Sequence, residues 1–144
     1  MAHALVQNCL HVVFSTKDRL KLIPQEKQAR TWAYLAGICR NEKIFVHEIG
    51  GMEDHVHMLI QLPPTIALAD AVQEIKASSS KWLGKRFAWQ RGYGAFSVCR
   101  STLDRAAHYI RNQEAHHRRR DYEEEFIALL EKHGMQYDLA DIFR

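Results

Sequence analysis

The sequence predicts an α+β fold: a ferredoxin-like β-α-β-β-α-β sandwich, RRM-like in its order of elements, with two added C-terminal helices. Three observations predict this fold. Short β-type segments alternate with longer helical segments in that order, two neighbouring strands are separated only by a turn signal, and helical patterns alone follow residue 100. The 144 residues are expected to form one domain, 1–144, with a core of its own.

The first strand and helix are predicted from periodicity and from helix-starting residues. Apolar residues alternate within 6–16, which is typical of a half-buried strand. Pro24 suits the first turn of a helix, and good helix formers follow over Gln25–Asn41. Residues 43–49 are rich in β-branched and aromatic side chains and are therefore expected to form the second strand.

A hairpin is expected between the second and third strands. Gly50 and Gly51 are a turn signal, and 55–62 is expected to be a strand that ends at Pro63 and Pro64. In a ferredoxin-like sheet the first and third strands then form the central pair.

The second helix and fourth strand complete the unit. Thr65 is expected to cap a helix whose apolar residues recur at helical spacing as far as Trp82, which is expected in the core. Residues 87–99 are aromatic and contain glycine, so they are expected to form the fourth strand with an irregular start.

Two further helices are expected after the fourth strand. Ser101 and Asp104 resemble a capping box that opens a helix ending near Gln113. Residues 121–133 show an amphipathic pattern, and Gly134 stands where a helix commonly ends.

The composition indicates a soluble globular protein. Hydrophobic residues make up 47% and charged residues 26%, and no apolar run approaches the length of a membrane span. The N-terminal residues lack the pattern of a secretory signal. Cys9, Cys39 and Cys99 are widely spaced and odd in number, which favours neither a disulfide framework nor a cysteine zinc site. A cytoplasmic location is therefore expected.

Positive charge is concentrated in one block. Residues 76–120 contain eleven Lys/Arg and two Asp/Glu, a net charge of +9, whereas the remainder carries −6. Such a block suits a polyanion such as DNA, and the alternative is a solvated face that keeps the protein soluble. The candidate contacts to DNA phosphates are Lys76, Lys81, Lys85, Arg91 and Arg105.

His55 and His57 form a candidate metal site. Residues i and i+2 of a strand point to the same face, so the two imidazoles are expected side by side on the sheet. Asp54 precedes them and is a candidate partner for one ring, or else a turn residue. With nine histidines in the chain, a chance pair is the alternative.

Tyr109 and Gln113 form a second candidate pair. On a helix, residues i and i+4 lie on one face. A tyrosine hydroxyl can attack a phosphodiester, and a glutamine oxygen can complete a metal shell that leaves positions for phosphate oxygens. The alternative is a core tyrosine and a surface glutamine. Tyr122 and Tyr137 are rival nucleophiles by residue type, but neither has a ligand-type residue four positions on.

The sequence closely resembles the single-tyrosine HUH transposases of the smallest bacterial insertion sequences and the REP-associated tyrosine transposases. The resemblance runs from about His11 to Tyr137. It is carried by these segments, quoted in chain order: HVVFSTKDR, DHVHMLI, IKASSSKW, WQRGYGAFSV and YIRNQEAHH.

The resemblance implies a function and a set of site residues. It implies metal ligation by His55, His57 and Gln113, and Tyr109 as the nucleophile. The activity implied is cleavage and rejoining of single-stranded DNA at hairpin-bearing element ends, through a 5′-phosphotyrosine and with Mg²⁺ or Mn²⁺. The family also implies a homodimer in which the tyrosine helix of one subunit can face the histidines of the other.

A non-catalytic nucleic-acid-binding module is the alternative. The segment 91–96 superficially resembles the RNP1 motif of RRM domains, although it follows the second helix whereas RNP1 belongs on the third strand. A binding-only relative that keeps the fold is a further alternative, against which the intact Tyr109 and histidine pair argue.

Overall fold

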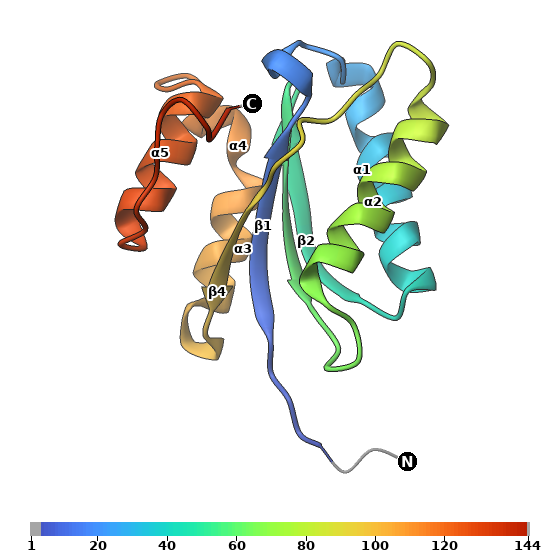
Figure 1. Cartoon of the computed structure of the whole chain (residues 1–144), viewed down its shortest axis with the longest axis vertical. Coiled ribbons are helices and arrows are strands. Elements are labelled where there is room, and N and C mark those ends of the chain that lie inside the picture. The colour runs from blue at the N-terminus through green and yellow to red at the C-terminus, as the bar shows by residue number, and fades with distance from the viewer. Residues whose placement is uncertain (1–3, 144) are drawn as a thin grey trace.

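The computed structural model describes residues 4–143 and contains a four-stranded antiparallel sheet with helices on both faces (Figure 1). The strand order is β2-β3-β1-β4. β1 (Cys9–Ser15) and β3 (His55–Gln61) form the central pair, while β2 (Phe45–Met52) and β4 (Gly94–Val98) form the edges. The ferredoxin-like order and the central pair expected from the sequence are confirmed.

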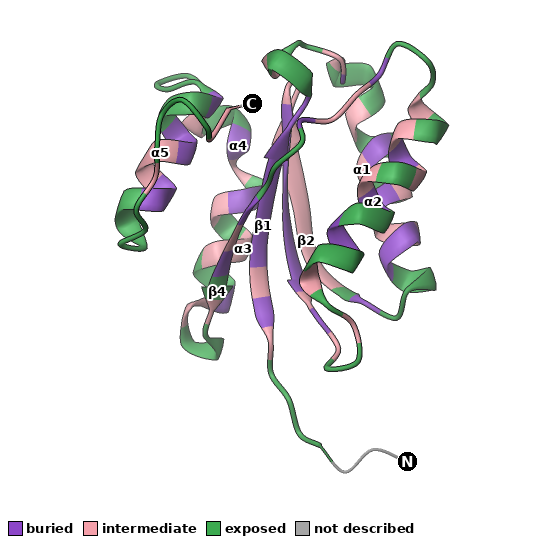
Figure 2. Cartoon of the chain, in the orientation of Figure 1, coloured by how far each residue is buried: buried purple, intermediate pink, exposed green. Residues whose placement is uncertain are grey.

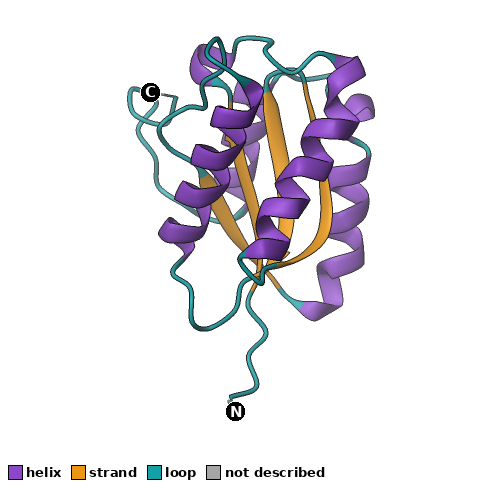
Figure 3. Cartoon of the chain, turned by 90° about the vertical axis from the view of Figure 1, so that its right-hand side faces the viewer, coloured by secondary structure: helices purple, strands orange, loops and turns teal. Residues whose placement is uncertain are grey.

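Helices cover both faces of this sheet (Figures 1 and 3). α1 (Gln25–Asn41) and α2 (Leu68–Leu83) lie side by side on one face, and α1 has the bounds that the sequence predicts. The other face carries three helical segments instead of the expected two, because the chain leaves helical geometry at Asn112. These segments are α3 (Leu103–Arg111), α4 (Gln113–His116) and α5 (Tyr122–Lys132), and two short 3-10 turns are η1 (Lys17–Arg19) and η2 (Arg100–Thr102).

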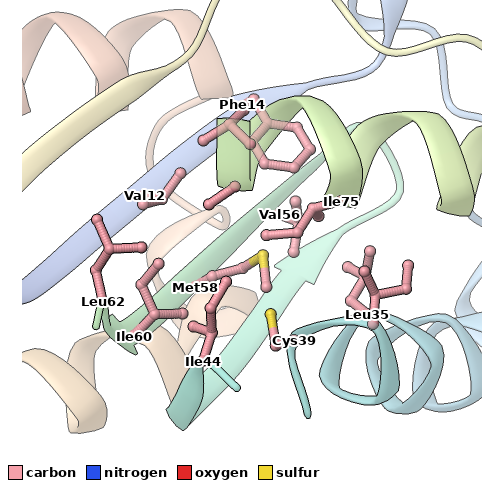
Figure 4. Packing of buried hydrophobic residues seen from close by; sticks show 13 residues of the cluster. Val12, Phe14, Leu35, Cys39, Ile44, Val56, Met58, Ile60, Leu62 and Ile75 are labelled. Carbon is pink, nitrogen blue, oxygen red and sulfur yellow. The ribbon is translucent and has the colours of Figure 1, made fainter. Parts of the chain in front are cut away.

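The main core lies between the sheet and the α1–α2 pair (Figures 2 and 4). Even-numbered residues of the two central strands, such as Val12 and Met58, point into it and meet Leu35 and Ile75. Trp82, expected in this core, is 39% exposed, because its ring stacks on Tyr34 with 4.3 Å between ring centroids and keeps an open side in the last turn of α2.

A second apolar layer lies on the opposite face of the sheet. Val13 and Phe96 pack there against Tyr122 and Phe126 of α5, and a further cluster joins β1 and β3 to α3 through Ile110. An RRM presents base-stacking aromatic residues on an open sheet face. Helices cover that face here, which argues against the RRM-like alternative.

The ends of the strands differ from the expected ones by a few residues. The largest difference is in the fourth strand, for which 87–99 was expected and which pairs with β1 only over Gly94–Val98. Before it, an isolated bridge joins Trp89 to Thr16, so the irregular start is confirmed.

Gly50 and Gly51 are not the turn that the sequence analysis expects, because both lie inside β2 and the chain reverses at Glu53 and Asp54. Each glycine instead permits a close approach of backbone. A Cβ on Gly50 would lie 2.3 Å from the carbonyl oxygen of Ile110 in α3, and one on Gly51 would lie 2.2 Å from the carbonyl oxygen of His55.

Replacement of Gly50 by Ala is expected to destabilise the protein by about 1–3 kcal/mol, because the new methyl group has to push α3 away from β2. Denaturant unfolding measures this change. Gly37→Ala is the matched control, since nothing lies within 4 Å of its Cβ and alanine favours the helix by about 0.5–1 kcal/mol. Equal stability of the two variants would contradict the close docking of α3.

Two expected helix caps are absent and a third is present. Thr65 does not cap α2, which begins at Leu68 after Ala67. Thr65 lies instead within a turn in which the Ile66 N–H donates to the Pro63 carbonyl oxygen. Ser101 lies inside η2, so its expected capping box with Asp104 does not form. The last helix begins with a capping box at Asp121, and Gly134 follows its end with φ of 65° as expected.

None of the helices described between residues 4 and 143 is long and apolar enough to cross a membrane.

Candidate active site

His55 and His57 lie on the face of β3 that α3 and α5 cover, and both side chains are fully buried. Their odd positions on the strand put them on the same face, as expected. Both Nε2 atoms face the same carboxylate oxygen, Oε1 of Glu125 in α5, at 3.5 Å from His55 and 2.9 Å from His57. The sheet therefore presents two imidazoles toward one point.

The other nitrogen of each ring also has a dedicated partner. His55 Nδ1 lies 2.7 Å from Asp54 Oδ1, and His57 Nδ1 lies 2.7 Å from Nε2 of His11 in β1. Such contacts fix the orientation of a ring and decide which nitrogen carries the proton. Burial, followed by the electrostatic interaction with His57, lowers the pKa of His11 to about 3, so His11 is a neutral partner.

Gln113 belongs to the same group of side chains, although it lies on α4 and not on the tyrosine helix. Its Oε1 is 3.0 Å from His55 Nε2, and its amide nitrogen donates to the carbonyl oxygen of Tyr109 at 3.4 Å. The side chain is buried. The sequence-predicted trio of His55, His57 and Gln113 is therefore brought together.

Tyr109 reaches this group from the last turn of α3. Its hydroxyl donates to Oε2 of Glu125 in a short hydrogen bond, and its ring meets His57 edge to face with 5.8 Å between centroids. Burial and the neighbouring Glu125 raise the pKa of the Tyr109 hydroxyl, which therefore stays protonated as the donor. The tyrosine lies beside the histidines of its own chain.

Glu125 is the site residue that sequence reasoning missed. It is 1% exposed and contacts Tyr109, His57 and His117. Burial alone raises the pKa of its carboxyl group, but the surrounding histidines outweigh burial and hold this pKa well below its usual range. A signal was present, because position 125 falls between Tyr122 and Phe126 on the apolar side of the last helix.

His117 is the second unexpected member. Its Nε2 lies 3.0 Å from Gln113 Oε1 and 3.2 Å from Glu125 Oε1. Burial lowers the pKa of His117, but the hydrogen bond to Glu125 and the charge of that carboxylate produce a net upward shift. Its ring nitrogen therefore suits donation to both oxygens.

These side chains fit a divalent cation. Ligand atoms of His55, His57, His117 and Glu125 all lie within 4.8 Å of one another. When His55 donates its Nδ1 proton to Asp54, the lone pair of its Nε2 faces the acceptor oxygens of Gln113 and Glu125. Acceptors that face one another in a buried place are repulsive unless a cation or a proton lies between them.

A cavity of about 390 Å³ opens beside the tyrosine. Its apolar wall includes Phe96 of β4, and Arg105 and Lys132 contribute positive charge to its lining. Tyr109 and His11 line it too, so the tyrosine borders this cavity. Its size and charge suit part of a nucleotide strand.

The predicted DNA-contacting residues occupy different places. Arg105 is exposed on α3 beside the cavity, whereas Lys81, Lys85 and Arg91 are exposed at the end of α2 and in the following loop. Lys76 is occupied, since its Nζ donates to the carbonyl oxygens of residues 90, 91 and 92 at 2.9, 3.3 and 2.7 Å. Burial lowers the pKa of Lys76 to about 8.

The two rival tyrosines have other surroundings. The Tyr122 hydroxyl is buried and donates to Gln90 Oε1, and the Tyr137 hydroxyl donates to Glu131 at the surface. Among the described residues, the hydroxyls of Tyr122 and Tyr137 thus hydrogen-bond to Gln90 and Glu131 and not to the paired histidines.

Two solved structures share the fold. A candidate transposase from Deinococcus radiodurans R1 has a TM-score of 0.64 at 20% identity, over 78% of this chain and 95% of that one. The REP-associated tyrosine transposase bound to a REP hairpin has a TM-score of 0.59 at 14% identity. The match covers 76% of this chain and 68% of that one. At these identities the likeness is one of fold.

Sequence comparison gives the family. The transposases for insertion sequence element IS200 of Salmonella typhimurium (strain LT2) and Salmonella typhi are each 28% identical over 118 residues, covering 74% of this chain and 77% of theirs. The family model for IS200-like transposases matches residues 5–113, which is most of the chain. The chain therefore belongs to the IS200-like transposases, a family of DNA transposition proteins.

Proposed function

We propose that this transposase cuts and rejoins single-stranded DNA at hairpin-bearing element ends, with Tyr109 as the nucleophile and with a divalent metal held by His55, His57 and Gln113. The observation that carries the proposal is the convergence of side chains from four segments, β3, α3, α4 and α5. The Tyr109 hydroxyl and the Nε2 atoms of both histidines all contact Glu125, and Gln113 contacts His55.

The proposed reaction exchanges one phosphodiester for another. The Tyr109 hydroxyl loses its proton as its oxygen bonds to phosphorus, and the bond from phosphorus to the 3′ oxygen breaks. That oxygen takes up a proton and leaves as a 3′ hydroxyl, so the step has no net change in protons. The 5′ phosphate remains on the tyrosine. Attack of a 3′ hydroxyl on this phosphotyrosine restores a DNA strand and frees the tyrosine, so rejoining needs no nucleotide cofactor.

The metal and its ligands have separate tasks in this proposal. A bound Mg²⁺ or Mn²⁺ would polarise the phosphate and offset the charge that develops on it. Asp54 and His11 orient the two imidazoles through contacts to their Nδ1 atoms. The amide nitrogen of Gln113 donates to the carbonyl oxygen of Tyr109 and so holds that side chain against the tyrosine helix.

The DNA strand is proposed to enter through the cavity beside Tyr109. Arg105 and Lys132 line it, and more positive charge lies on the loops that follow α2. The REP-associated tyrosine transposase of similar fold is bound to a REP hairpin, which makes hairpin DNA the natural first substrate to test.

The direct test is a covalent adduct. The protein is incubated with Mn²⁺ and single-stranded DNA that carries a hairpin and is labelled at its 3′ end, and the products are separated under denaturing conditions. Under the proposed polarity the labelled strand moves with the protein. Binding without an adduct would instead favour the binding-only alternative.

Binding is expected to prefer single-stranded hairpin DNA over a blunt duplex of the same length and to weaken as salt rises. Each cationic side chain that no longer neutralises a phosphate should make the plot of log K against log salt shallower by about 0.7–0.9. Fluorescence anisotropy with Lys81→Gln and Lys85→Gln measures that change at two exposed positions. Equal affinity for the duplex would contradict the proposed substrate.

A homodimer is proposed as the working unit. β2 is an edge strand with Phe45 62% exposed, and open edges favour pairing with another chain. Sedimentation is expected to show dimers, and an active monomer would contradict them. Mixing the Tyr109→Phe and His57→Ala variants then tests whether the active site is shared between subunits. Activity returns only if the tyrosine of one chain acts with the histidines of the other.

A further inference from the structure

Glu125 lies at the centre of the histidine cluster, yet the metal site proposed above gives it no role. Its Oε1 is 2.9 Å from His57 Nε2, 3.2 Å from His117 Nε2 and 3.5 Å from His55 Nε2. The next two acidic residues toward the N-terminus, Glu123 and Glu124, are exposed. The helix therefore turns one carboxylate of this acidic run into the protein interior.

The spacing of the donor atoms matches a shared metal shell. Ligands bound to one cation at about 2.1 Å are separated from their neighbours by about 3.0–3.4 Å in octahedral or tetrahedral geometry. The distances from Glu125 Oε1 to the two histidines of β3 are 2.9 and 3.5 Å, and that from Gln113 Oε1 to His55 is 3.0 Å. These three separations therefore lie close to the spacing that ligands of one ion have.

The charge of the ligands is a second, independent reason to expect Glu125 among them. His55, His57 and Gln113 are neutral donors in their metal-binding forms, and all three are buried. A divalent cation taken out of water among neutral ligands is poorly compensated, and hard cations prefer carboxylate oxygens. Glu125 is the carboxylate of the cluster that the described residues form, and it is 1% exposed.

We infer that Glu125 is a direct ligand of the divalent metal through Oε1 and that its Oε2 holds the Tyr109 hydroxyl beside that metal. The inference rests on the proposed function, to which it adds an anionic ligand and a link between metal and nucleophile. Two imidazoles, an amide oxygen and a carboxylate oxygen would hold the ion, which would supply positive charge to the phosphate oxygens.

His117 has a positioning role in this arrangement. Its Nε2 contacts the oxygens of both Gln113 and Glu125, the two ligands that come from helices. A hydrogen bond from this nitrogen holds the two oxygens toward the histidines of β3, as outer partners of metal ligands commonly do.

The test is metal binding without DNA. Calorimetric titration of the full chain with Mn²⁺ is expected to show that Glu125→Gln lowers the affinity for Mn²⁺ by at least about tenfold. Glu124→Gln is the matched control, because glutamine preserves the capping box with Asp121 and the residue points outward. Glu124→Gln is expected to bind Mn²⁺ as the wild type does.

The outcomes separate this inference from the proposed function. If His57→Ala binds Mn²⁺ as tightly as the wild type, the proposed metal site itself is wrong. If His57→Ala loses binding while Glu125→Gln keeps or increases it, only the role of Glu125 is wrong, and the carboxylate is a spacer or a competitor of the metal.

A crystal of the wild-type protein soaked in Mn²⁺ keeps the inference testable if Glu125→Gln does not fold. Anomalous scattering is expected to place the ion about 2.0–2.2 Å from Glu125 Oε1 and from the Nε2 atoms of His55 and His57. An ion bound to the histidines with the Glu125 oxygen beyond ligand distance would overturn the inference.

Discussion

Tyr109→Phe is expected to abolish the covalent protein–DNA product while leaving binding of hairpin DNA largely unchanged. Only the hydroxyl takes part in the proposed chemistry, and phenylalanine keeps the ring that packs edge to face on His11 and His57. The measurement is the yield of labelled adduct under denaturing conditions, alongside anisotropy for binding.

Tyr137→Phe is the matched control for the loss of a hydroxyl. That hydroxyl lies at the surface and donates to Glu131, so its removal is expected to leave the adduct yield as it is. An undiminished adduct in Tyr109→Phe would refute the nucleophile assignment and direct attention to Tyr122, whose ring lies 4.8 Å from that of His55 between centroids.

His57→Ala is expected to lower the rate of DNA cleavage by at least about a hundredfold, and removal of metal by a chelator should have the same effect on the wild type. The variant loses a proposed ligand and leaves Glu125 without one of its hydrogen-bond partners. Single-turnover cleavage with added Mn²⁺ or Mg²⁺ measures the effect.

His47→Ala is the control for the loss of an imidazole. It lies on the neighbouring strand β2, where its Nε2 is 3.8 Å from Cys9 Sγ. Cleavage by this variant is expected to follow the wild type. Wild-type cleavage that proceeds at full rate in excess chelator would exclude a metal role for the histidine pair.

The order of the elements was predictable from the sequence because local patterns decide it. Strand periodicity and helix formers gave α1 its correct bounds and gave the central pair of strands. The prediction of a turn at Gly50 and Gly51 was wrong, since a glycine pair signals either a turn or a close backbone approach. Only the position of Ile110 in the folded chain shows which of the two applies.

The gathering of the histidines, the tyrosine and the glutamine was predictable because their types and spacing resemble those of a known family. Glu125 was missed, because acidic residues at the start of a helix are expected from the helix dipole alone, although its place on the apolar side of the last helix was a signal. His11 was equally hidden, since its contact with His57 depends on the register in which Val13 of β1 pairs with His57 of β3. Sequence periodicity does not give that register.

The central claim is that Tyr109 itself becomes bonded to DNA, and peptide mapping of the adduct tests it most directly. Trypsin is expected to release Tyr109 in the peptide 106–111, and each of the other four tyrosines falls in a different tryptic peptide. After nuclease digestion of the adduct, mass spectrometry is expected to find a nucleotide phosphate on Tyr109 in 106–111. A nucleotide on any other peptide, or no modified peptide from an active reaction, would contradict the account.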